Sequence, residues 1–241
     1  TGVATAEIPP NQLRTLFLPW VPTLKGPEGD QCNQVNASPG TARLDKGAFH
    51  LVSTRPIAVY QFNPLQYASV GGKDWTKCKP SAPTCAFPTN CNSTYYTYTN
   101  DASLLLPSTA MTGNYRVAGR HGYFHPLASF PEFVTITGTQ DNTDVSVYVS
   151  TTGTIEAGGP IGKIPGGGNT TLSLNAGDVV QLLTYTSLSG VGELSGSLIQ
   201  ANKPVQVIAG TACSLAPDDK IACDHTEESL LPAETFGKHY L

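Results

Sequence analysis

Phe133-Val-Thr-Ile-Thr137 is the clearest strand pattern in this chain, because apolar and polar residues alternate along it. A turn-forming segment follows at Thr139–Asp144, and the same alternation returns in Val145-Ser-Val-Tyr-Val149. Further strand patterns lie at residues 172–174, 179–185, 195–200 and 205–209. Short strands separated by turn signals, with no amphipathic helix among them, predict a β-sandwich.

The first half of the chain contains a segment with a similar pattern. Residues 48–60 align without a gap on residues 196–208, which places Pro56 on Pro204. Each copy predicts a strand, a small polar pair, a cation, a proline and a second strand. Proline lacks an N–H donor and suits the first residue of a strand. We therefore predict an all-β protein of two tandem β-sandwich modules, residues 1–130 and 131–241.

The composition excludes several classes of protein. The 241 residues carry a net charge of −4, which argues against a nucleic-acid partner because such proteins are usually basic. No apolar stretch approaches the roughly 18 residues of a membrane span. Hydrophobic residues make up 39% of the chain, enough for a folded core. The first residues lack the basic and apolar regions of a signal peptide, so we expect a mature end or an internal cut.

The six cysteines predict disulfide bonds and an oxidising, extracellular location. No Cys-x-x-Cys pair occurs, which argues against zinc, and free buried thiols are the alternative. We expect Cys213 to pair with Cys223. The other four cysteines allow three connectivities, of which Cys85–Cys91 with Cys32–Cys78 is favoured. A cysteine-rich loop at 71–93 is then a disulfide-pinned insertion in the first module.

No motif in the chain indicates catalysis or a cofactor. Ser195 lacks the preceding glycine of a nucleophile elbow. His121 and His125 are four apart, but Gly122 and Pro126 argue against a helix that would align them on a metal. We therefore predict no catalytic residue, no cofactor and no metal site, and a protein that is not an enzyme. Asn-x-Ser/Thr glycosylation sequons occur at Asn36, Asn92 and Asn169.

The C-terminal end carries the most specific sequence. Cys223-Asp-His-Thr-Glu-Glu228 is followed by Leu231-Pro-Ala-Glu-Thr-Phe-Gly-Lys-His-Tyr240, which resembles the signature of the IgGFc-binding protein N-terminal domain family. The upstream segments Val59–Pro64 and Asn100–Pro107 resemble those of secreted bacterial, myxobacterium-like members. The residues that match the signature are Asp224, His225, Glu227, Glu228, Pro232, Glu234, Gly237, Lys238 and Tyr240.

The resemblance implies a secreted β-protein that serves in binding or adhesion as part of a larger extracellular chain. It carries no catalytic residues, and the family pattern continues past Tyr240, so we expect the second module to be truncated. The expected partner is a protein or glycan ligand at the cell surface. Aromatic contacts to it are expected from Trp75, Tyr95, Tyr96 and Tyr98.

Two alternatives to a binding module remain open. The low charge and Thr-rich strands also suit a structural subunit of an extracellular filament or sheath, in which edge strands pair between copies by self-association. A glycan-active enzyme is the second alternative, because the separation of paired carboxylates cannot be inferred from a sequence.

Overall fold

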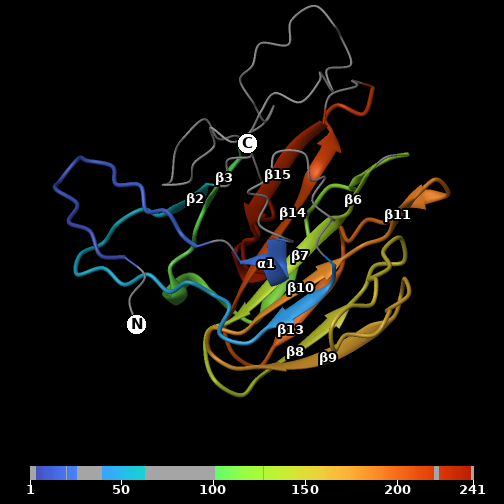
Figure 1. Cartoon of the computed structure of the whole chain (residues 1–241). Helices are drawn as coiled ribbons and strands as arrows, with labels where there is room; N and C mark the ends of the chain where they lie inside the picture. Colours follow the sequence, from blue (N-terminus) through green and yellow to red (C-terminus); the bar gives the residue numbers. More distant parts are fainter. Residues whose placement is uncertain are drawn as a thin grey trace, which may run out of the picture.

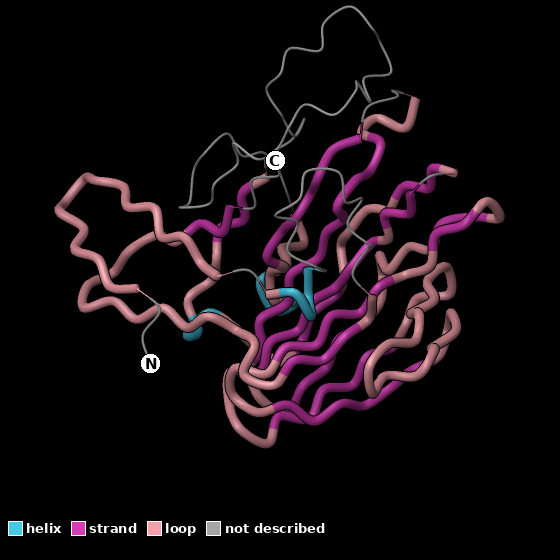
Figure 2. The backbone as a smooth tube through the Cα atoms, in the orientation of Figure 1, coloured by secondary structure: helices cyan, strands magenta, loops and turns pink. Residues whose placement is uncertain are grey.

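The computed structural model of the chain describes residues 4–19, 21–25, 40–62, 101–126, 128–219 and 223–239 (Figures 1 and 2). The side chains of Lys25, Ala128 and Cys223 are not described. The expectations that lie outside the described residues concern the loop at 71–93, the contacts Trp75, Tyr95, Tyr96 and Tyr98, the cysteines Cys32, Cys78, Cys85 and Cys91, the sequons at Asn36 and Asn92, and Tyr240.

The larger sheet has five antiparallel strands in the order β1-β10-β7-β14-β15. Their bounds are β1 Ala42–Leu44, β7 Glu132–Gly138, β10 Val179–Leu183, β14 Val205–Leu215 and β15 Cys223–Ser229. Buried and half-buried residues alternate strictly along β7, as the sequence pattern predicts for a strand with one face on the core. The whole of β10 is buried. Both predicted strands are confirmed.

The smaller sheet has four strands in the order β4-β13-β8-β9, again antiparallel. Their bounds are β4 Asn114–Arg116, β8 Thr143–Tyr148, β9 Asn169–Leu174 and β13 Leu198–Ala201. Val145 and Val147 are buried on one face of β8, which confirms the alternation seen in the sequence. In the view of Figure 1, β8 and β9 lie below β7 and β10 of the larger sheet.

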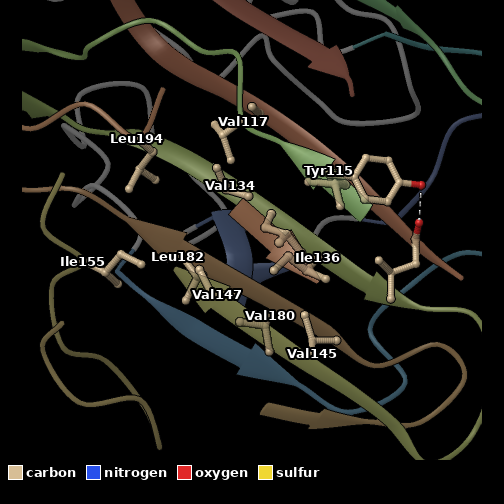
Figure 3. Packing of buried hydrophobic residues seen from close by; sticks show 14 of the residues in the cluster. Tyr115, Val117, Val134, Ile136, Val145, Val147, Ile155, Val180, Leu182 and Leu194 are labelled. Atoms are coloured by element: carbon tan, nitrogen blue, oxygen red, sulfur yellow. Dashed lines mark hydrogen bonds between the residues drawn. The ribbon is translucent and has the colours of Figure 1, made fainter. Parts of the chain in front are cut away.

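The two sheets pack face to face over one hydrophobic core (Figure 3). Val134 and Ile136 of β7 contribute from the larger sheet, and Val147 and Ile199 from the smaller. Each fully buried aliphatic side chain stabilises the fold by about 1.5–3 kcal/mol relative to leaving it in water. Tyr115 of β4 is fully buried among them. The shared core makes the two sheets a sandwich.

The remaining elements are short. Two-stranded sheets join β2 Tyr60–Phe62 with β3 Ala102–Leu104, β5 Tyr123–His125 with β6 Ala128–Phe130, and β11 Thr186–Ser187 with β12 Gly190–Val191. The helical elements are α1 Pro22–Lys25 and the 3-10 turns η2 Ser108–Ala110 and η3 Ala233–Thr235. None of the helices in the described ranges has the length or apolar character to cross a membrane. The protein is mostly β.

The predicted arrangement as two tandem sandwiches is not confirmed, and the boundary between residues 130 and 131 stays a prediction. In the described residues, β1 and β4 come from the first half and join sheets built largely from the second half. The expected strands within residues 48–59 are wrong, because these residues contain no strand and most are exposed. The repeat matched a local pattern, but a strand also needs a neighbour that takes up its backbone hydrogen bonds.

Candidate functional site

β15 carries the core of the family-like signature. Along this strand His225, Glu227 and Ser229 are buried, whereas Glu228 is exposed. The alternation follows from strand geometry, which sends successive side chains to opposite faces. β15 pairs with β14 along one edge, and this pairing has an irregularity between Thr211 and Ser214. The signature residues Asp224, His225, Glu227 and Glu228 therefore lie on the last strand of the larger sheet.

The two-stranded β2–β3 sheet lies at the other edge of β15 (Figure 1). The backbone N–H of Glu227 donates to Asp101 Oδ2 at 2.8 Å, and the N–H of Ser229 donates to Ser103 Oγ. Ser103 is fully buried and in turn donates to Ser229 Oγ at 3.1 Å. Two edge groups that would otherwise face water are thus satisfied by side chains, which blunts this edge against pairing with another chain.

A buried polar pair lies beside the β2–β3 sheet. His225 Nε2 is 3.4 Å from Glu227 Oε2, and the side chains are each 3% exposed. The amide of Gln61 in β2 donates to both carboxylate oxygens of Glu227, at 3.2 and 3.3 Å. A carboxylate removed from water must be compensated by donors of this kind. The pair and Gln61 therefore hold β15 and β2 in a fixed relationship.

A pocket of about 330 Å³ opens next to this cluster. Its lining includes Asp101, Gly119, Arg120, Gly210, Thr226 and Glu228. Arg120 donates to Asp218 Oδ1 at 2.6 Å and to the carbonyl of Leu215, and Asp101 is engaged by the Glu227 N–H. Glu228 is exposed, and its one described hydrogen bond is the 3.3 Å bond from Ser103. Glu228 is thus the carboxylate most available to a ligand.

A second pocket, of about 380 Å³, is lined by Thr41, Glu156 and Tyr185 among others. It contains no signature residue, and Glu156 is already paired with Lys163 at 2.9 Å. In the described part of the chain, no group of three His, Cys, Asp or Glu side chains is arranged to hold a metal ion. His121 lies 3.3 Å from Asp218. The pocket beside β15 is therefore the better candidate site.

Glu132 is a buried carboxyl group next to Gly119, which lines the pocket beside β15. Its side chain is fully buried at the start of β7, and its Oε2 accepts the N–H of Leu194 at 2.6 Å. Its Oε1 has no hydrogen-bond partner and faces Gly119, where an added Cβ would lie 2.1 Å away. Burial raises the pKa of Glu132 to about 8. The carboxyl group is therefore mainly protonated at neutral pH.

The other signature residues lie after β15. Pro232 is buried. Glu234 in η3 is exposed and accepts hydrogen bonds from Asn114 Nδ2 at 2.7 Å and Thr112 Oγ1 at 2.9 Å. The Asn114 hydrogen bond holds the pKa of Glu234 below its usual range.

Two further signature residues, Gly237 and Lys238, are exposed, and Asp224 is half-buried. The structure therefore places Glu227 and Glu228 in the wall of the pocket and His225 beside Glu227, while Glu234 contacts Asn114 of β4. The signature contributes a structural segment as well as a pocket wall.

Cys213 is buried in β14 and is disulfide-bonded. Its predicted partner, Cys223, has an undescribed side chain, so the pairing stays a prediction. In the register of the two strands Leu215, two residues after Cys213, is the residue that lies opposite Cys223. The other predicted pairs involve cysteines outside the described ranges.

Five residues of the site and its surroundings were not predicted from the sequence: Gln61, Asp101 and Ser103, which contact β15, and Arg120 and Glu132, which do not. Asp101 and Ser103 lie in the Asn100–Pro107 segment that resembles the family, so this segment was the available signal. Glu132 has the same parity as the buried Val134 and Ile136, which is also visible in the sequence. No sequence signal joins Arg120 to the carbonyl of Leu215.

Comparison with known proteins gives two matches. The family model described as IgGFc binding protein matches residues 101–241. The IgGFc-binding protein of Homo sapiens is 29% identical over 143 residues, which make up 59% of this chain and 2% of the human protein. The chain thus spans a very small part of that relative's length. No solved structure gives a significant match. The expected similarity to secreted bacterial members of the family stays a prediction.

Proposed function

Because the chain belongs to the IgGFc-binding protein family, we propose that it is an extracellular ligand-binding or adhesion module of a larger secreted or cell-surface protein. The observation that carries this proposal is the pocket beside β15, whose wall includes the signature residues Glu227 and Glu228. Its ligand is a protein segment or a glycan. The human relative is named for binding the Fc part of immunoglobulin G, which makes that fragment one probe.

The strand that forms the pocket wall is held in place by its neighbours. Asp101, Ser103 and Gln61 hold β15 in place by hydrogen bonds to its backbone or to Glu227. A site whose supporting groups are already ordered loses less entropy when a ligand binds. The exposed carboxylate of Glu228 can accept hydrogen bonds from sugar hydroxyls or pair with a cation on a protein ligand. These features support binding of a polar ligand.

We propose that the module binds without catalysis. Ser195 is the hydroxyl that a hydrolase hypothesis would first consider, and its Oγ donates to the carbonyl of Gly119 at 3.0 Å. The same Oγ accepts the N–H of Gly119 at 3.1 Å. A hydroxyl engaged in both directions by the backbone is a poor nucleophile without an adjacent base. Turnover in a broad glycoside and ester substrate screen would favour the enzyme alternative instead.

The test is direct binding to immobilised immunoglobulin G Fc and to a printed glycan panel. We expect Glu228→Gln to weaken binding of the recognised probe by at least about tenfold, because a hydrogen bond to a charged group contributes about 1.5–3 kcal/mol and about 1.4 kcal/mol is a factor of ten. Glu156→Gln is the matched control, since Glu156 is a partly exposed carboxylate that lines the other pocket. Equal binding by Glu228→Gln and the unchanged protein to every recognised probe would refute this site.

A further inference from the structure

The two main sheets have four edge strands, and they are not equally protected. The edge of β15 is covered by β3 through Asp101 and Ser103. The edge strands β1 and β4 are three residues long each. β9 is six residues long, and among the described residues no strand pairs with its outer edge. Figure 1 shows β9 at the outer border of the sandwich.

The residues of β9 themselves carry none of the usual protections of an edge strand, and the described contact on its outer edge is that of Arg43 with the Ser173 carbonyl. Its sequence, Asn169-Thr-Thr-Leu-Ser-Leu174, contains no charged residue and no proline. Its pairing with β8 runs through six consecutive residue pairs without a bulge. Natural proteins commonly place lysine, proline or a bulge on exposed edges to prevent pairing with another chain. A long, flat, uncharged edge is therefore a surface available for strand addition.

The alternation of the β8–β9 ladder defines which backbone groups face outward. The N–H of Asp144 donates to Asn202 Oδ1, and the Asp144 carbonyl accepts the N–H of Asn202, both on the side of β8 away from β9. Asp144 therefore does not exchange backbone hydrogen bonds with Ser173, its partner in β9. The N–H and carbonyl groups of Ser173, Thr171 and Asn169 thus point away from β8. In agreement, Arg43 Nη1 donates to the Ser173 carbonyl at 2.8 Å from outside the ladder.

We propose that β9 pairs antiparallel with β9 of a second copy of this chain, with Thr171 opposite Thr171 of that copy. In this register each Thr171 exchanges two backbone hydrogen bonds with its equivalent, and Ser173 lies opposite Asn169. Thr–Thr pairs are favourable across antiparallel strands, and no like charges meet. The strand is thus complementary to itself, which argues for a second copy rather than an unrelated peptide as the occupant.

The proposed contact is isologous, so it closes as a two-fold dimer and does not propagate into a filament. The four-stranded sheets of two copies would form one continuous sheet. β15 and its pocket belong to the other sheet, at the edge opposite β1, whose Arg43 reaches β9. The dimer therefore leaves two pockets free, and a surface that presents the ligand repeatedly would be bound bivalently.

The first test is the molar mass of the protein by light scattering over about 1–200 µM, with Thr171→Pro and Thr171→Val as variants. Proline removes the outward N–H without touching the β8 ladder, whereas valine keeps the N–H and the strand propensity. We expect the wild type and Thr171→Val to approach twice the 25.4 kDa protomer mass. Thr171→Pro should stay at the protomer mass, with circular dichroism and melting temperature showing that it remains folded.

The second test fixes the register. Thr171→Cys places two cysteines opposite each other at a Cα separation of about 5.5 Å, which suits a disulfide. We expect it to form a covalent dimer on mild oxidation. Ser173→Cys, on the same exposed face of β9, should not, because Ser173 meets Asn169 in this register. A monomeric wild type throughout the range, a dimer that persists in Thr171→Pro, open-ended polymers, or equal cross-linking of both cysteines would each overturn the proposal. None of these readouts involves the pocket or its ligand.

Discussion

The hydroxyl of Tyr115 donates a 2.8 Å hydrogen bond to the carbonyl of Val205, joining β4 of the smaller sheet to the first residue of β14 in the larger sheet (Figure 3). The same hydroxyl oxygen accepts the N–H of Thr112 at 3.2 Å. Tyr115 and Val205 are fully buried, so the Val205 carbonyl cannot turn to water if the hydroxyl is removed, whereas Thr112 is half-buried. The single oxygen atom therefore ties the two sheets together within the core.

Tyr115→Phe should lower the free energy of unfolding by about 1–3 kcal/mol, because it leaves the Val205 carbonyl and the Thr112 N–H unpaired. The phenyl ring keeps the packing, so the urea m-value should not change. Urea unfolding of both proteins at pH 7 measures the difference. A loss below about 0.5 kcal/mol would show that neither group depends on the hydroxyl.

Glu132→Gln should remove a pH dependence of stability. Burial raises the pKa of Glu132 from 4.5 to about 8 in the folded protein, so the folded state keeps a proton that the unfolded chain releases. The free energy of unfolding should therefore fall as the pH rises from about 4.5 to 8, by at most about 1.4 kcal/mol per pH unit.

The side-chain amide that replaces the carboxyl group in Glu132→Gln can still accept the N–H of Leu194 without ionising. The variant should thus gain stability relative to the wild type as the pH increases through this window. Unfolding measured at pH 5, 6, 7 and 8 tests the expectation. Parallel curves for the two proteins would mean that Glu132 is not the titrating group.

Gly210→Ala should disturb the pairing of β14 with β15. A Cβ at this position would lie 2.3 Å from the Thr226 carbonyl oxygen, which belongs to the backbone and has little room to move. We expect a loss of about 1–3 kcal/mol. Gly162→Ala is the control, since no atom lies within 4 Å of its added Cβ. Thermal unfolding distinguishes the two, and equal melting temperatures would contradict the close approach of these strands at Gly210.

Ser103→Ala should open the protected edge of β15. It removes the acceptor for the Ser229 N–H, while the Glu227 N–H keeps its bond to Asp101. Amide hydrogen exchange should become about tenfold faster at Ser229, because local opening no longer breaks a hydrogen bond there. The amides of β7, which lies inside the sheet, serve as the reference. Unchanged exchange at Ser229 would mean that β3 does not protect this edge.

Peptide mapping under non-reducing conditions should recover Cys213 linked to Cys223. The loop between them is short, so the disulfide restricts the unfolded chain only moderately. It should therefore stabilise the fold by less than about 3 kcal/mol. A free-thiol titration of the denatured protein should find no reactive cysteine. A Cys213 peptide linked to any other cysteine would replace this pairing, and free thiols would weaken the extracellular assignment.

The local strands were predictable from the sequence because their burial follows from residue order. β7 and β8 alternate apolar and polar residues, and the structure buries the apolar ones. The second half of β14 was not predicted: Gly210-Thr-Ala-Cys-Ser214 has small residues whose burial depends on β7 and β15 on either side. Such residues carry little periodic signal of their own.

Pairing between distant segments was not predictable for a different reason. Strand partners are chosen by tertiary packing, and a three-residue strand such as β1 or β4 carries too few side chains to specify its neighbour. The site shows the same limit. His225 and Glu227 were identified from the signature, but Gln61 reaches Glu227 across 166 positions of sequence. Likewise a buried Glu132 contradicts the average behaviour of carboxylates, which are almost always exposed or paired.

The pairing of β1 with β10 has a consequence for how this protein is made. Thr41 accepts the Leu183 N–H, and Ala42 lies opposite Gln181, so the sheet is completed by a strand synthesised long before its neighbour emerges from the ribosome. Contacts between residues so far apart in the sequence slow folding. Partly folded chains then expose hydrophobic surface and unpaired strand edges, which favour aggregation. A recombinant fragment cut to the family match at residues 101–241 would leave the flank of β10 bare, so a gene fragment for expression should begin upstream of Thr41.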